Sequence, residues 1–195
     1  MKFTCLLENT TCDARLTAEH GLSVLAETPH HTLLFDTGAT GVFADNAAAL
    51  GVDLKAVDTA ILSHGHYDHG GGLRRFLSEN ETAPVWLHRQ AFVLHRALHG
   101  DELADIGLDP ALREEPRLRF VDADTELDDE LTLLTGVAGD ALSPRANETR
   151  GKRQERPEGQ EEVRQNPIWP ILRLLHHAGV ARLCLRDKEV GRRAH

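Results

Sequence analysis

Apolar residues at the start of the chain fall into three short runs, within residues 2–8, 21–28 and 31–38. Gly21 and the segment 29–31, which begins with a proline, separate these runs, and glycine and proline commonly mark turns. The pattern predicts three β-strands and therefore a β-rich opening.

The hydrophobic period then changes to that of a helix. Within residues 40–51, four apolar side chains can share one helical face: Val42, Phe43, Ala47 and Leu50. Gly51 stands where a helix C-cap glycine is expected. Residues 56–63 form a short apolar run typical of a buried strand, and residues 71–79 return to a helical pattern.

Strand-like and helix-like segments continue to alternate beyond residue 80. Residues 83–88, 117–123 and 131–136 have the pattern of strands, whereas residues 89–100 have that of a helix closed by Gly100. Such alternation is typical of α/β layers, so the sequence predicts an α/β fold.

The last quarter of the chain has a different chemistry. Residues 150–164 hold nine charged side chains in fifteen and one strong apolar group, Val163, too little to offset chain entropy. We therefore predict a main domain over residues 1–149 and a flexible charged linker over 150–165. We expect an atypical basic segment with one helix over 166–195, where four apolar residues have helical spacing: Ile168, Ile171, Leu172 and Leu175.

Charge and hydropathy exclude some classes of protein. The net charge is −9, but residues 1–149 hold 11 basic and 25 acidic side chains, whereas residues 150–195 hold 11 and 6. An acidic main domain argues against nucleic acid as a partner. No apolar run approaches the roughly 20 residues that cross a bilayer, and the N-terminus lacks the apolar region of a signal peptide. We therefore expect a cytoplasmic protein without a membrane partner.

Three histidines and one aspartate lie within six positions directly after the buried strand that ends at Ser63: His64, His66, Asp68 and His69. Residues two apart in an extended loop project to the same side, so His64 and His66 can offer imidazoles to one ion at about 2.0–2.1 Å for zinc. Asp68 and His69 can face a second ion, because carboxylate and imidazole suit zinc, manganese or iron. The alternative is a set of ordinary polar loop residues; the density of ligands favours a metal site.

Three glycines, Gly70, Gly71 and Gly72, follow the histidines directly. They remove side-chain bulk beside the predicted ions. We also expect N–H groups exposed at the start of the next helix, which would favour an anionic substrate.

The segment "LSHGHYDHGGGL" resembles the metal-binding motif H-x-H-x-D-H of the metallo-β-lactamase superfamily, and "LLFDTG" is similar to the strand-end aspartate motif of that fold. More narrowly, "LLENTT", "AEHGLSVLAET" and "LLFDTGATGVFADNAAALGVDL" resemble the subgroup of dihydropterin ribofuranosyl-aminobenzene phosphate synthase-like proteins. The likeness extends from about residue 2 to about residue 73 and continues weakly through "GVAGDALSPRANET".

The resemblance implies an αββα sandwich that binds two divalent metal ions, with zinc expected first and manganese or iron as alternatives. His64 and His66 would bind the first ion, and Asp68 and His69 the second. Asp68 would also orient the nucleophilic water or accept its proton. Asp36 would support the loop that carries these four ligands, called the ligand loop below, by hydrogen bonding. For Glu19, His20 and Asn9, an approach to the pocket and a plain surface position both stay open.

The superfamily builds its site from two similar halves, and the second half supplies further ligands. The settings in which those ligands occur are missing after Thr149, where the candidates are His176, His177 and His195. The first two lie on an apparent amphipathic helix, which is unlike a ligand position. We therefore expect the second half of the sandwich to be incomplete, as in a truncated or frame-shifted member. Such a chain would leave one sheet face and one edge uncovered, unless the tail helix or a second copy in a homo-oligomer covers them.

These features predict a hydrolase-type enzyme in which a metal-bound hydroxide attacks an ester, phosphoester, lactone or related small, anionic substrate. A degenerate metal-binding or interaction module without turnover is the alternative, because the C-terminal ligands are missing. A di-iron redox module is less favoured, since His66 stands where such members tend to carry glutamate.

Overall fold

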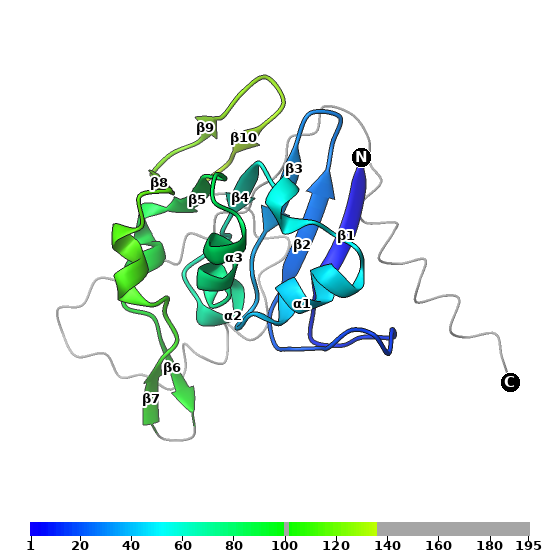
Figure 1. The fold of residues 1–195 in the computed structure, drawn as a ribbon. Coiled ribbons are helices and arrows are strands. Elements are labelled where there is room, and N and C mark those ends of the chain that lie inside the picture. Colours follow the sequence, from blue (N-terminus) through cyan, green and yellow to red (C-terminus); the bar gives the residue numbers. More distant parts are fainter. Residues whose placement is uncertain (100–101, 136–195) are drawn as a thin grey trace, which may run out of the picture.

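A six-stranded sheet with the order β1-β2-β3-β4-β5-β8 forms the centre of the protein (Figure 1). The computed structural model describes residues 1–99 and 102–135 of the 195-residue chain. The sheet strands are β1 (Lys2–Leu7), β2 (Ser23–Glu27), β3 (Thr32–Phe35), β4 (Thr59–Ile61), β5 (Val85–His88) and β8 (Leu118–Val121). Strands β1, β2 and β3 pair antiparallel, whereas β3, β4, β5 and β8 pair parallel.

Helices cover one face of this sheet. Neighbouring parallel strands need crossover connections, and these connections run over that face. They are α1 (Val42–Ala49), α2 (Tyr67–Gly70) and α3 (Leu73–Glu79), with single 3₁₀ turns at η1 (Leu54–Ala56), η2 (Arg89–Phe92) and η3 (Pro110–Glu114). Phe43 of α1 and Phe76 of α3 are fully buried in one cluster with Leu34 and Val85 of the sheet. The main core therefore lies between the sheet and its helical layer.

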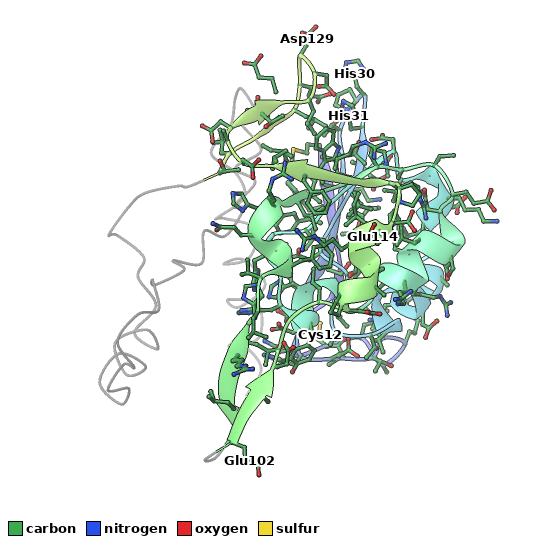
Figure 2. All side chains as sticks on the ribbon, turned by 90° about the vertical axis from the view of Figure 1, so that its left-hand side faces the viewer. Cys12, His30, His31, Glu102, Glu114 and Asp129 are labelled. Atoms are coloured by element: carbon green, nitrogen blue, oxygen red, sulfur yellow. The ribbon has the colours of Figure 1, made fainter. Side chains whose placement is uncertain are left out.

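A hairpin packs on the opposite face of the sheet. It consists of β9 (Thr125–Glu126) and β10 (Thr132–Leu133), and its Leu133 is buried against Ile61 and Val121. His31, in the turn between β2 and β3, holds the hairpin through a contact from Nε2 to Asp128 Oδ2 at 3.1 Å. Figure 2 shows His30, His31 and Asp129 together at this end of the molecule.

The predicted α/β class is confirmed, and so are the strands expected in residues 2–8, 21–28, 31–38, 56–63, 83–88 and 117–123. The helix expected in residues 40–51 is α1, and Gly51 ends it in the left-handed region at φ 72°. The second half of the predicted sandwich, the linker 150–165 and the segment 166–195 lie outside the described residues.

The helix predicted for residues 89–100 is wrong. Only Arg89–Phe92 form a helical turn, which His88 caps by accepting the Gln90 N–H at its Nδ1. The chain then forms strand β6 (Arg96–His99), which pairs with β7 (Glu102–Asp105) in an antiparallel hairpin. This hairpin projects away from the sheet, with Glu102 near its tip (Figure 2). Pairing between neighbouring segments has overridden the local helical pattern.

No helix in the part of the chain that the structure describes is long and apolar enough to cross a membrane. The longest of them, α1, has eight residues.

Asn46 of α1 joins three parts of the N-terminal half. Its buried side chain donates from Nδ2 to the carbonyl oxygens of Leu6 at 2.8 Å and Thr17 at 2.9 Å, and its Oδ1 accepts the Thr17 N–H. It thereby fixes the long connection between β1 and β2 against the helical layer.

Replacing Asn46 with alanine should lower the free energy of unfolding by about 2–3 kcal/mol, because buried backbone groups lose their hydrogen-bond partners. Urea denaturation measures the change. The matched control is Asp45→Ala on the same helix, which removes only an exposed ion pair with Arg75 and should change stability by no more than about 0.5 kcal/mol. Equal stability of the two variants would contradict the role given to Asn46.

Candidate metal centre

Two neighbouring parallel strands place the candidate site at their carboxyl ends. Asp36 directly follows β3, and the segment from Ser63 to His69 follows β4. The ends of adjacent parallel strands meet at one edge of a sheet, where ligand sites of α/β folds commonly lie. The Asp36 N–H donates to the carbonyl oxygen of Ile61 at 3.0 Å, so the two strand ends are joined through their backbones.

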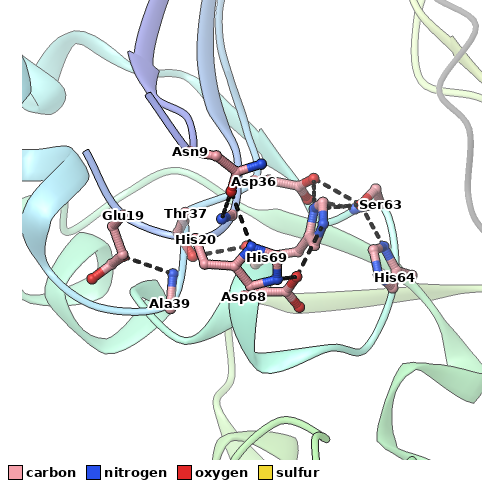
Figure 3. A network of polar contacts seen from close by, with 11 residues as sticks. Asn9, Glu19, His20, Asp36, Thr37, Ala39, Ser63, His64, Asp68 and His69 are labelled. Atoms are coloured by element: carbon pink, nitrogen blue, oxygen red, sulfur yellow. Dashed lines mark hydrogen bonds and ion pairs between the residues drawn. The ribbon is translucent and has the colours of Figure 1, made fainter. Parts of the chain in front are cut away.

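Asp36 is the polar centre of this edge. Its side chain is fully buried, and its backbone lies in the left-handed region at φ 57°, which is uncommon for a residue other than glycine. Oδ1 accepts the Ser63 N–H at 2.8 Å, and Oδ2 accepts the Ser63 hydroxyl at 2.7 Å and His69 Nδ1–H at 2.7 Å (Figure 3). The carboxylate therefore fixes both the backbone and a side chain of the ligand loop.

The hydrogen bonds assign the tautomers of two histidines. The Ser63 hydroxyl donates to Asp36, so Ser63 Oγ accepts from Nδ1 of His64, 2.9 Å away. His69 likewise donates from Nδ1 to Asp36. In its neutral form each ring therefore has its lone pair on Nε2, which is the arrangement found in metal-binding histidines with a carboxylate or carbonyl partner.

Burial and neighbouring charge shift three of the ionisable groups here. Burial raises the pKa of Asp36, while hydrogen bonds from His69 and Ser63 oppose the shift. Burial lowers the pKa of His69, but the hydrogen bond and charge of Asp36 outweigh it, and the net pKa is raised. Burial, helped by the neighbouring histidines, lowers the pKa of His64 to about 3. His64 is therefore neutral near pH 7, as a metal ligand must be.

Donor atoms of His64, Asp68 and His69 all lie within 4.8 Å of one another. The ring centroids of His64 and His69 are 4.2 Å apart, and the His66 ring packs edge-on against His64 at 4.5 Å. The structure thus brings three of the four predicted ligands into one donor group and places His66 beside it. Imidazole and carboxylate donors, supported by a buried acceptor, fit a divalent ion of the zinc type.

The N-terminal connection also reaches this cluster. His20 Nε2 lies 3.2 Å from Asp68 Oδ2, and His20 Nδ1 lies 3.0 Å from Asn9 Oδ1 (Figure 3). Glu19, by contrast, accepts the N–H groups of Ala39 and Thr40 and so holds the loop after β3. Of the residues left open by the sequence, His20 contacts a candidate ligand, Asn9 orients His20, and Glu19 supports the backbone.

The N–H groups of the three glycines are not free to bind a substrate. The N–H groups of Gly70, Gly71 and Gly72 donate to the carbonyl oxygens of His66, Tyr67 and Gly38, respectively. The glycines serve close packing instead, because a Cβ on Gly72 would lie 2.2 Å from the carbonyl oxygen of Thr37. They allow the loop after β3 to approach the loop after β4.

Sequence reasoning missed His95, which lies next to the site. Its ring centroid is 4.9 Å from that of His66, and the residue is buried, with 7% of its surface exposed. It lies in a segment predicted as a helix, away from the histidine motif, so only its residue type could have drawn attention to it.

The model of the metallo-beta-lactamase superfamily matches residues 16–158. Two proteins of Methanocaldococcus jannaschii are each 32% identical to the chain. One is an uncharacterized protein, aligned over 56% of this chain and 41% of its own length. The other is 7,8-dihydropterin-6-methyl-4-(beta-D-ribofuranosyl)-aminobenzene-5'-phosphate synthase, aligned over 50% of this chain and 35% of its own length.

A similar fold is seen in the crystal structure of Tm1679, a metal-dependent hydrolase of the beta-lactamase superfamily. That protein is 31% identical, with a TM-score of 0.52, and the match covers 68% of this chain and 47% of the other. The chain thus spans less than half of the length of each of these relatives.

Substituting alanine for Gly72 should lower the free energy of unfolding by about 2 kcal/mol or more, because the added Cβ meets backbone oxygens that cannot rotate away. Thermal or urea denaturation measures the effect. Gly41→Ala is the matched control, since its Cβ would meet only the flexible side chain of Arg75 at 3.4 Å. Similar losses in the two variants would show that close packing at Gly72 is unimportant.

Replacing Asp36 with asparagine keeps the shape of the side chain but removes its charge and an acceptor. We expect zinc affinity to fall by about 10–100-fold, as for other partners of ligating histidines. Competition with a chromophoric chelator measures the affinity. Asp122→Asn, which affects an exposed pair with Arg89, serves as the control. Unchanged zinc affinity in Asp36→Asn would refute the supporting role of Asp36.

Proposed function

Because the chain belongs to the metallo-beta-lactamase superfamily, we propose that it is a metal-dependent hydrolase that acts on a small molecule. The four histidine and aspartate side chains of the loop after β4 would hold two divalent ions, His64 and His66 the first and Asp68 and His69 the second. The observation that supports this proposal most directly is the buried carboxylate of Asp36, which fixes His69 and, through Ser63, His64 with Nε2 available.

Zinc is the first choice of metal, and manganese or iron would also suit the donor set. When bound, such ions polarise the scissile bond and lower the pKa of water toward about 7. The protein's own part is to hold the donors in place and to manage the proton. Asp68 Oδ2 lies 3.8 Å from His69 Nε2 and 3.2 Å from His20 Nε2, which suits a carboxylate that orients the attacking water and accepts its proton.

The proposed substrates are small esters, phosphoesters or lactones, bound without a nucleic acid or membrane partner in a cytoplasmic protein. The side chain of His20 is 71% exposed and touches Asp68. Because its two ring nitrogens contact Asn9 and Asp68, its part would be to position Asp68 beside the substrate.

A second candidate function is metal binding without turnover. It is favoured by the number of ligands, because the proposed pairs provide two protein ligands for each ion, whereas catalytic zinc sites usually have three. A site with fewer ligands binds its ions more weakly. Measurement of metal content and turnover on the same preparation separates the two candidates.

For the hydrolase, we expect about two metals per full-length chain and turnover of a phosphodiester, ester or lactone probe that a chelator abolishes. Asp68→Asn should lower kcat by at least about 100-fold, as expected for loss of a general base. His30→Ala, at the opposite end of the sheet, should leave turnover unchanged. Bound metal without turnover on any probe class would support the second candidate, and metal well below one per chain would exclude both.

A further inference from the structure

We propose that His95 is a third imidazole ligand of the ion held by His64 and His66. This inference rests on the proposed metal site and extends it to a residue outside the H-x-H-x-D-H motif. Within the described residues, His95 Nε2 is a buried side-chain nitrogen without a hydrogen-bond partner. A buried polar atom left unsatisfied costs about 1–3 kcal/mol, so its presence beside a histidine cluster calls for an explanation.

The backbone holds His95 firmly against the ligand loop. The Ile106 N–H donates to the carbonyl oxygen of His95 at 2.9 Å, and the Tyr67 N–H donates to the carbonyl oxygen of Ile106 at 2.9 Å. His66 and Gly107 form a β-bridge. One extended segment, residues 106–107, therefore pairs with His95 on one side and with the ligand loop on the other.

A second contact brings the same segments together. A Cβ on Gly65 would lie 1.9 Å from the carbonyl oxygen of Ala91, so the turn η2 touches the backbone of the ligand loop where glycine leaves room. His95 follows this turn by three residues. Its position is thus fixed from both directions along the chain, independently of any side-chain contact.

The rings have a spacing that suits a shared ion. Two imidazoles bound to one zinc at about 2.0–2.1 Å in a tetrahedral site have ring centroids roughly 5 Å apart. The centroids of His66 and His95 are 4.9 Å apart, and those of His64 and His66 are 4.5 Å apart. In this structure the donor atoms within 4.8 Å of one another are those of His64, Asp68 and His69, so binding by His66 and His95 would require rotation about their side-chain bonds with the backbone in place.

The surroundings of His95 also match those of a metal ligand. Its side chain hydrogen-bonds to the backbone of Ala91 and Gln90. A histidine that binds metal through one nitrogen commonly donates the other N–H to a backbone carbonyl. With His95, the first ion would have the three protein ligands that are usual for a catalytic zinc site.

The first test is zinc affinity of the full-length chain, measured by competition with a chromophoric chelator. In His95→Leu, the more tightly bound of the two zinc ions should bind at least about 100-fold more weakly. Loss of a ligand should cost more affinity than the 10–100-fold lost with a residue that only hydrogen-bonds to a ligand. In chelator, the melting temperature of His95→Leu should equal or exceed that of the wild type, because a buried unsatisfied nitrogen is removed. His30→Leu, an exposed histidine at the far end of the sheet, should change neither quantity.

The second test detects the bond itself. His95→Cys loaded with cobalt(II) should show a thiolate-to-cobalt charge-transfer band that is absent from the cobalt-loaded wild type and from His30→Cys. A cobalt-loaded His95→Cys without this band, or wild-type zinc affinity in His95→Leu, would overturn the inference while leaving the proposed function intact. Failure of the wild type to bind zinc at all would overturn both.

Discussion

The arrangement of the candidate site depends on one buried carboxylate. Asp36 follows β3 at the point where the chain turns left-handed, and its two oxygens accept from the backbone and hydroxyl of Ser63 and from His69. A buried carboxylate is costly unless donors surround it, and these three donors all belong to the ligand loop. The hydrogen bonds to Asp36 thus hold the loop after β4 in position. The parallel pairing of β3 with β4 brings this loop within hydrogen-bonding distance of Asp36.

Two other devices keep the surrounding loops in place. Glu19 accepts the N–H groups of Ala39 and Thr40, and glycines at 71 and 72 let the same loop lie against the start of α3. Neither device adds a metal donor. Each restricts the backbone that carries the metal-binding side chains. A more restricted backbone holds these side chains more precisely in the geometry that a metal ion requires.

Much of the fold could be predicted because its signals are local. Strands β1 to β5 and helix α1 show the expected hydrophobic periods, and the density of histidines in the motif by itself predicts metal binding. Asp36 could be recognised from its place in "LLFDTG".

The structure of the segment after β5 could not be predicted, because its strand β6 is determined by pairing with β7 and not by its own hydrophobic pattern. His95 was missed for the same reason, since its neighbour His66 is 29 positions away and the backbone at Ile106 and Gly107 joins the two segments. The close packing of the glycines could not be predicted, because the backbone atoms that they approach belong to distant parts of the sequence.

The parallel arrangement of β3, β4 and β5 has a consequence for how the site comes into being. Asp36, the four residues of the motif and the segment that docks on them all lie between residues 36 and 107. Regions made early in synthesis can fold before later ones emerge. The donor loop can therefore be assembled on the nascent chain while the residues beyond the sheet are still in the ribosome, and its formation need not wait for them.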